Sequence, residues 1–215
     1  MKIWIAACAS AAALLLLAGC ETVSKEQCVA GDWSGLGRAD GAQGYQSSRI
    51  EDIVKDCGRH GITPDVQAYM GGWHEGVRLY CTPLNGFNTG RQGKSLSSVC
   101  PPQLAGAFAE THAIGRRIWT AEDRMRQAER RVSSEEDRMR DARRELDRLD
   151  CGGLKGDERD ACRHKRRRLR DRMDDARYAL QDARFELNDR RRDYEITVDR
   201  ATADAERVIP GFRGN

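Results

Sequence analysis

The chain has few aromatic residues and, for its many charged residues, almost no net charge. Four Phe, four Trp and five Tyr among 215 residues exclude a large aromatic core. After residue 115, Arg alternates with Asp or Glu almost without pause. Residues 116–208 hold 27 Lys or Arg and 24 Asp or Glu. This near balance favours a charge-laced surface over a strongly polycationic binder.

The signatures of common enzymes are missing as well. The sequence has no G-x-S-x-G, S-x-x-K or Cys/His signature. It also has no Gly-rich phosphate loop followed by Lys and Ser or Thr. Asp32, Asp40 and Asp65 could be paired acids, but helix capping or a turn explains each of them equally well. We therefore expect no enzymatic activity, no catalytic residues and no cofactor.

An apolar run from Ile3 to Leu17 follows Lys2 and ends in Leu17-Ala18-Gly19-Cys20. This pattern resembles a bacterial lipoprotein signal peptide with its lipobox. At about 17 residues the run is short for a spanning helix, which needs roughly 20, although a single N-terminal membrane helix is the alternative. We expect residues 1–19 to be removed, Cys20 to carry lipid including palmitate, and residues 20–27 to form a linker. The residue after Cys20 is Glu21 and not Asp. Under the sorting pattern of enteric lipoproteins, the absence of Asp at this position favours the outer membrane, with the protein facing the periplasm.

The mature chain keeps six further cysteines, an even number that indicates three disulfides in an oxidising compartment. They are Cys28, Cys57, Cys81, Cys100, Cys151 and Cys162. We expect Cys151 to pair with Cys162, because both lie in a short segment between two helical patterns. The other four allow three connectivities.

A metal site is the competing use of two of these cysteines. Cys57-x-x-His60, His74 and Cys81 offer the ligand set of structural zinc. The spacing is not a standard one, and exported cysteines are normally oxidised, so we expect no metal.

Two series of mostly apolar residues recur at 4-3 spacing, the pattern of a coiled coil. Glycines between them predict a reversal, and thus an antiparallel coiled-coil hairpin over 113–208 with its tip at 150–163 and a tail over 209–215. Paired residue numbers should sum to about 318, as for Met139 with Leu180. We also expect exposed ion pairs of Glu122 with Arg126, Glu136 with Arg140 and Glu186 with Arg190. The first series is Ile114, Ile118, Ala121, Met125, Ala128, Val132, Glu135, Met139, Ala142, Leu146 and Leu149; the second is Leu169, Met173, Ala176, Leu180, Ala183, Leu187, Arg190, Tyr194, Thr197 and Ala201.

Residues 28–112 form a Gly- and Cys-rich region with a loose internal repeat. Aromatic residues are followed by glycines at helical spacing, as in Trp33 with Gly37, Gly41 and Gly44. Such glycines share one helix face and let another backbone come close. The pattern predicts several short helices stapled by disulfides, with Thr63 capping one and Pro64 at its first position. A turn-rich domain with few helices is the alternative.

An ordered set of residues runs through positions 28–115: Asp32-Trp33, Gly37, Asp40-Gly41, Gly44, Cys57, Gly61-Ile62, Pro64-Asp65, Tyr69, Gly72, Gly76, Leu79-Tyr80-Cys81, Asn85-Gly86-Phe87, Gly90, Gly93 and Cys100. With this set, the region resembles a family of proteobacterial envelope lipoproteins classed only as a domain of unknown function. The resemblance implies an envelope lipoprotein and no established catalytic residues, and the hairpin lies outside it.

A basic cluster follows the predicted tip and is the candidate partner-binding site: Arg163, Lys165, Arg166, Arg167, Arg168 and Arg170. Export makes nucleic acid improbable, so the acceptors would be an acidic envelope protein, lipopolysaccharide or peptidoglycan. A solvated helix face balanced by nearby acids is the plainer interpretation. We expect a non-enzymatic lipoprotein that acts through its hairpin, with homo-oligomerisation open. The alternative is a periplasmic ligand- or metal-binding module built on the Gly- and Cys-rich domain.

Overall fold

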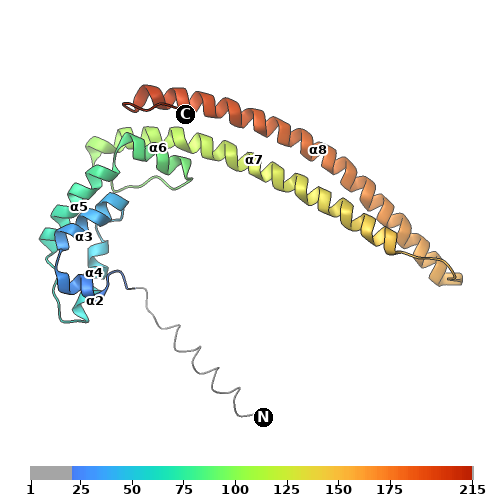
Figure 1. Ribbon diagram of the computed structural model, residues 1–215, viewed down its shortest axis with the longest axis horizontal. Helices are drawn as coiled ribbons and strands as arrows, with labels where there is room; N and C mark the ends of the chain where they lie inside the picture. The colour runs from blue at the N-terminus through green and yellow to red at the C-terminus, as the bar shows by residue number, and fades with distance from the viewer. Residues whose placement is uncertain (1–20, 215) are drawn as a thin grey trace, which may run out of the picture. The chain divides into compact units, whose positions relative to one another are not determined.

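The computed structural model describes residues 21–214, which form seven α-helices and no strand. The mainly α fold class is therefore confirmed, while the lipobox lies outside the described residues. No helix within residues 21–214 is long and apolar enough to cross a membrane. The helices are α2 (Lys25–Ala30), α3 (Trp33–Gln43), α4 (Arg49–Gly58), α5 (Val66–Tyr80), α6 (Pro83–Arg91), α7 (Pro102–Arg148) and α8 (Gly156–Val208) (Figure 1).

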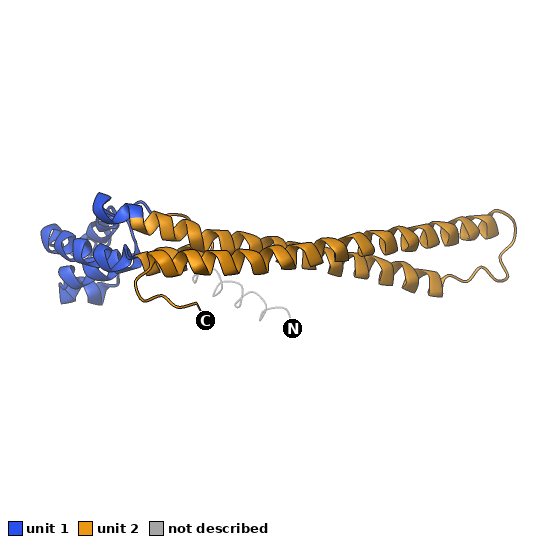
Figure 2. Ribbon diagram, turned by 90° about the horizontal axis from the view of Figure 1, so that it is seen from above, with its two compact units in different colours: residues 1–82, 97–106 blue, residues 83–96, 107–215 orange. Residues whose placement is uncertain are grey.

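The chain divides into two compact units (Figure 2). Unit 1 comprises residues 1–82 and 97–106, and unit 2 comprises residues 83–96 and 107–215. Helix α7 begins in unit 1 and continues through unit 2.

In unit 1, α3 and α5 run in the same direction and touch backbone to backbone. A Cβ atom built on Gly37 would lie 2.0 Å from the carbonyl oxygen of Tyr69, and one on Gly72 would lie 1.9 Å from that of Ser34. No side chain fits at such distances, so glycine is required at both positions. The predicted use of glycine for close helix contact is confirmed here.

Two disulfides hold unit 1 and resolve the open connectivity. Cys28 bonds to Cys57 and Cys81 bonds to Cys100. Cys28 and Cys57 lie in the apolar core together with Ile53 and Tyr69, all of them at most 1% exposed.

The predicted start of α5 is wrong in detail. Asp65 is the cap, because its carboxylate accepts a hydrogen bond from the Ala68 amide at 2.9 Å, and the helix begins at Val66. Thr63 and Pro64 precede the cap. An Asp directly before the first helical residue satisfies the amide three positions later, which Thr63 is too far back to reach.

In unit 2, α6 and α7 repeat the glycine contact of α3 and α5. A Cβ atom on Gly90 would lie 2.1 Å from the carbonyl oxygen of His112, and one on Gly115 would lie 2.1 Å from that of Phe87. Equivalent positions are 49 residues apart between α3 and α6 and 39 residues apart between α5 and α7. The corresponding residues are Gly37 and Gly86, Gly41 and Gly90, Gly44 and Gly93, Tyr69 and Phe108, Gly72 and Thr111, Gly76 and Gly115, and Tyr80 and Trp119.

Helices α7 and α8 form an antiparallel hairpin, visible as two long neighbouring helices in Figure 1. Every predicted heptad position is buried or half-buried, so both series are confirmed as the seam. Ala128, Ala142, Ala176 and Ala183 are at most 5% exposed. Such small residues bring the two helices close but bury little apolar area.

Ion pairs across the hairpin agree with the predicted register. Arg117 with Asp204 and Glu145 with Arg172 have residue numbers that sum to 321 and 317. The expected same-helix pairs of Glu122 with Arg126 and of Glu186 with Arg190 are confirmed. The expected pair of Glu136 with Arg140 is wrong, because Glu136 accepts from Arg184 of α8 at 2.9 Å instead. At this position a partner across the seam lies within the same reach as one on the same helix.

The polar seam residue Glu135 is 7% exposed and has its own partner. Its two carboxylate oxygens lie 2.9 and 3.3 Å from the Arg138 guanidinium, one turn along α7. This contact compensates the burial of the carboxylate.

Apolar residues close the seam where α6, α7 and the end of α8 meet. Phe87, Ile114, Ala205 and Ile209 form a buried cluster, against which Phe212 packs edge-on to Phe87 with ring centroids 5.1 Å apart. The predicted tail therefore begins with packed residues, because Ile209 is 4% exposed.

Candidate functional site

Residues 149–155 connect α7 to α8 and are held by three local contacts. Cys151 bonds to Cys162, the pair that the sequence favours. The Asp150 carboxylate accepts from the Gly152 amide at 2.8 Å. Gly153 has a φ of 75°, a conformation that favours glycine. The turn is thus fixed on both sides before α8 begins.

Arg166 belongs to this clamp and differs from the rest of the basic cluster. Its guanidinium donates to the carbonyl oxygen of Leu149 at 3.2 Å. That carbonyl follows the end of α7, where intrahelical donors are lacking. Arg166 therefore has a structural task, which the sequence pattern does not reveal.

The other five members of the predicted cluster lie on the exposed surface of α8. Arg167 contacts the His164 ring, with 2.9 Å between Nη2 and Nδ1. Among residues 21–214, the side chains of Arg163, Lys165, Arg168 and Arg170 have neither an acidic partner nor a hydrogen bond. Their positive charges are available to another molecule.

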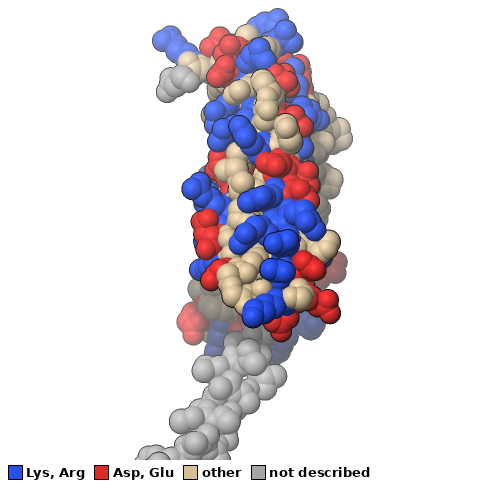
Figure 3. All heavy atoms as spheres, turned by 90° about the vertical axis from the view of Figure 1, so that its right-hand side faces the viewer, with Lys and Arg blue, Asp and Glu red and all other residues tan. Residues whose placement is uncertain are grey.

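Charge is segregated along the hairpin, although its total is nearly neutral. The end of the hairpin, residues 138–172, holds 14 Lys or Arg and 8 Asp or Glu, a net charge of +6. The remainder, residues 107–137 and 173–208, holds 13 basic and 17 acidic residues, a net charge of −4. Figure 3 views the molecule from the hairpin end and shows basic side chains gathered there. The overall count hides this polarity.

Unit 1 contains a buried polar network around Asp40. The carboxylate accepts from the Tyr69 hydroxyl at 2.8 Å and pairs with the Arg49 Nε at 3.0 Å. Burial and the hydrogen bond to Asp40 raise the pKa of Tyr69 far above its usual range. Asp32 and Asp65 cap α3 and α5. The three candidate acids therefore bind separate protein groups and do not form a pair.

The candidate zinc ligands are not brought together. Cys57 and Cys81 belong to different disulfides, which removes both thiolates. Within the described part of the chain, no three His, Cys, Asp or Glu side chains cluster as metal ligands would. His74 instead stacks edge-on against Trp73, with ring centroids 5.2 Å apart.

A surface hollow of about 660 Å³ lies in unit 1. Trp73 and Val77 of α5 contribute apolar atoms, as do Pro101 and Leu104 around the start of α7. His74, Arg78 and Gln103 supply polar groups at its border. The hollow suits a small, largely apolar ligand.

Residues 32–117 match the family described as "Protein of unknown function (DUF2799)". The match begins at the cap of α3 and ends within α7, so it contains both glycine-contact helix pairs and leaves the hairpin end outside. No curated protein and no solved structure matches the chain.

Proposed function

We propose that the protein is a non-enzymatic lipoprotein of the bacterial cell envelope, anchored through Cys20, that binds an acidic partner with the end of its hairpin. The lipobox pattern supports the anchor and the periplasmic-facing outer-membrane location. The envelope lipoprotein family resembled by residues 28–115 supports the same setting. The domain of unknown function is then the membrane-proximal part of the chain, and the hairpin is its interaction element.

One observation carries the binding role: within residues 163–170, four cations have neither an acidic partner nor a hydrogen bond among residues 21–214. Elsewhere along the hairpin, arginines commonly pair with acids, as Arg131 does with Glu186 and Arg184 does with Glu136. An exposed arginine that is not neutralised within the protein can bind carboxylate or phosphate bidentately. The clamped turn holds these groups in a defined arrangement, which lowers the entropy lost on binding.

Photo-crosslinking in cells tests the binding role. A photoreactive residue at Leu154 should give a discrete adduct, identified by mass spectrometry. Lys165→Ala with Arg168→Ala should weaken the adduct at least several-fold, because both charges lack internal partners. Arg124→Ala with Arg130→Ala is the matched control, since these two exposed arginines also have no ion pair in the described part of the chain but lie outside the cluster at 163–170. Equal adducts from both double variants would refute docking through the cluster.

Fractionation of Cys20→Ala tests the anchor independently. The variant should remain unprocessed or leave the membrane fraction, because it lacks the sulfur atom that would carry lipid. Unchanged processing and membrane association would refute the lipoprotein assignment while leaving the hairpin result intact.

The hollow in unit 1 favours a second candidate function, a periplasmic ligand-binding module. A bound apolar ligand would cover Trp73 and change its fluorescence. Replacing Leu104 with Glu, at the edge of the hollow, should abolish that response while the far-ultraviolet circular dichroism stays unchanged. A fluorescence response that survives this substitution would place the ligand elsewhere.

A further inference from the structure

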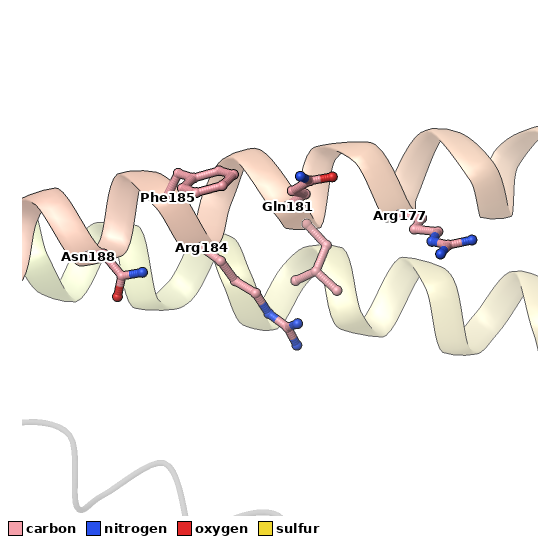
Figure 4. A pocket seen from close by; sticks show the side chains of 6 residues that line it. Arg177, Gln181, Arg184, Phe185 and Asn188 are labelled. Carbon is pink, nitrogen blue, oxygen red and sulfur yellow. The ribbon is translucent and has the colours of Figure 1, made fainter.

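Three large apolar side chains of α8 are exposed: Tyr178 at 69%, Phe185 at 62% and Ile196 at 47%. They are separated by seven and eleven residues, close to two and three helical turns, so they share one face. Leu180 and Leu187, which are buried in the seam, project from the opposite side. We call the face that contains Tyr178, Phe185 and Ile196 the outer face of α8. In Figure 4, Phe185 lies on the side of α8 away from α7.

Opposite charges flank these apolar residues along α8. Arg163 and Arg167 lie toward the hairpin end and Glu195 and Asp199 toward the other end, while Asp171, Asp174, Asp182 and Asp189 are also exposed between them. Arg163, Arg167, Glu195 and Asp199 are exposed, and none of the four has an ion pair among residues 21–214. Their neighbour Arg191, in contrast, reaches across the seam to Glu129 at 3.5 Å. Reversing the direction of α8 about Gln181 therefore brings Arg163 and Arg167 opposite Asp199 and Glu195.

A hollow of about 350 Å³ adjoins the middle of the outer face. Its lining residues are Arg177, Leu180, Gln181, Arg184, Phe185 and Asn188 (Figure 4). If two α8 helices align in opposite directions about Gln181, Tyr178 of a second copy lies beside Arg184 and Phe185. An aromatic ring there gains contact with a guanidinium and with another ring.

We propose that the outer face of α8 is a docking surface for a second copy of this chain, which forms a two-fold symmetric antiparallel dimer. The alignment about Gln181 places Arg163 opposite Asp199 of the second copy and Arg167 opposite its Glu195. Two-fold symmetry makes each pairing occur twice. The proposal goes beyond the proposed function and leaves Lys165 and Arg168, on the other side of α8, for the acidic partner.

The charges distinguish a second copy from an anionic membrane as the occupant. A membrane surface would accommodate the apolar side chains and attract Arg163 and Arg167, but its anionic headgroups would repel Glu195 and Asp199. A second copy satisfies both ends of the face and covers the apolar middle.

Sedimentation of the purified full chain over a concentration series tests the dimer. The wild type should show a concentration-dependent shift from monomer to dimer mass. Arg163→Glu with Arg167→Glu should weaken association about tenfold or more, because four attractive pairs become repulsive. Adding Glu195→Arg and Asp199→Arg to the same chain should restore it. Restoration shows that the reversed residues meet each other and that the first variant was folded.

Cysteine crosslinking provides the second readout. Gln181→Cys, next to the symmetry axis, should give a disulfide-linked dimer, whereas Asp137→Cys on the exposed surface of α7 should not. A protein that stays monomeric at its highest soluble concentration would overturn the proposal. So would a monomer that binds vesicles of anionic phospholipid through Arg163 and Arg167. Neither result affects the Leu154 adduct or the Cys20 fractionation.

Discussion

The helix pair α3 and α5 and the helix pair α6 and α7 share one contact geometry but are supported in different ways. In both, backbone meets backbone at glycine, and a glycine of positive φ follows the first helix, Gly44 at 78° after α3 and Gly93 at 73° after α6. An aromatic ring from the second helix covers that glycine in each case, Tyr80 in one pair and Trp119 in the other. The shared geometry identifies the glycine contact as the structural element of residues 32–117.

The side-chain hydrogen bonds at the helix end also match. The Trp73 Nε1 donates to the carbonyl oxygen of Tyr45, and the His112 Nε2 contacts that of Lys94, both at 2.9 Å. A polar ring nitrogen thus holds the residue after the glycine in each pair. Trp73 and His112 make the same contact although they are different residue types. Sequence identity between the two helix pairs is therefore lower than their structural similarity.

The cores of the two pairs differ. Tyr69 and Asp40 form a buried hydrogen bond in the first pair, whereas Phe108 and Thr89 occupy the same positions in the second. The Thr89 hydroxyl donates to carbonyl oxygens of its own helix. Disulfides staple unit 1, while α8 packs against α6 and α7 in unit 2. Because α8 packs on α6 and α7, this second pair does not need a buried hydrogen bond like that of Tyr69 with Asp40, or disulfides like those of unit 1.

The largest expected effect comes from filling a glycine contact. Gly72→Ala should lower the free energy of unfolding by about 3 kcal/mol, because its Cβ atom would meet a carbonyl oxygen of α3. Gly71→Ala is the matched control on the same helix, where the Cβ atom meets nothing within 4 Å. It should stabilise by about 0.5 to 1 kcal/mol. Urea unfolding measures both, and equal effects would refute the glycine contact.

Removing the disulfide of unit 1 and removing the packing of α8 in unit 2 should each destabilise only its own unit. Cys28→Ala with Cys57→Ala should destabilise unit 1 by about 3 kcal/mol through loss of the crosslink. Ile209→Ala should destabilise unit 2 by about 2 kcal/mol through the cavity left against α6 and α7. Hydrogen exchange of α5 and α6 peptides reports each unit. Loss of protection in both units from either change would show that the supports are shared.

The buried Tyr69 gives the smallest effect, which depends on pH. Because the pKa of Tyr69 is raised in the folded state, the neutral phenol stabilises folding below the unfolded pKa of about 10, and this contribution is lost as pH rises above it. Tyr69→Phe should cost about 1 kcal/mol at neutral pH and flatten this alkaline loss. Urea midpoints measured from neutral pH to about pH 11 test it. Parallel curves for wild type and variant would contradict the assignment.

Local patterns predicted much of this fold. The 4-3 spacing located the seam, the count between glycines implied close helix contact, and the segment between the heptads located the Cys151–Cys162 pair. The cap of α5 was wrong by two residues because Thr63 and Asp65 are both good caps, and only the geometry of the following amides selects one. The connectivity of Cys28, Cys57, Cys81 and Cys100 depends on tertiary contacts that no local pattern encodes.

The candidate site was predictable only in part. A run of cations is plain in the sequence, but the role of Arg166 depends on the position of the Leu149 carbonyl, just past the end of α7. The exposed apolar residues Tyr178 and Phe185 were overlooked, although the predicted heptad already places both of them off the seam. Segregated charge was hidden by a total that nearly cancels.

The most direct test compares photoreactive residues at two places in living cells, Leu154 at the hairpin end and Gln103 in the hollow of unit 1. The account predicts a discrete protein adduct from Leu154 that depends on Lys165 and Arg168, and none from Gln103. An adduct from Gln103 alone, with Leu154 silent in a disulfide-bonded and membrane-associated protein, would contradict the account and assign the function to the hollow.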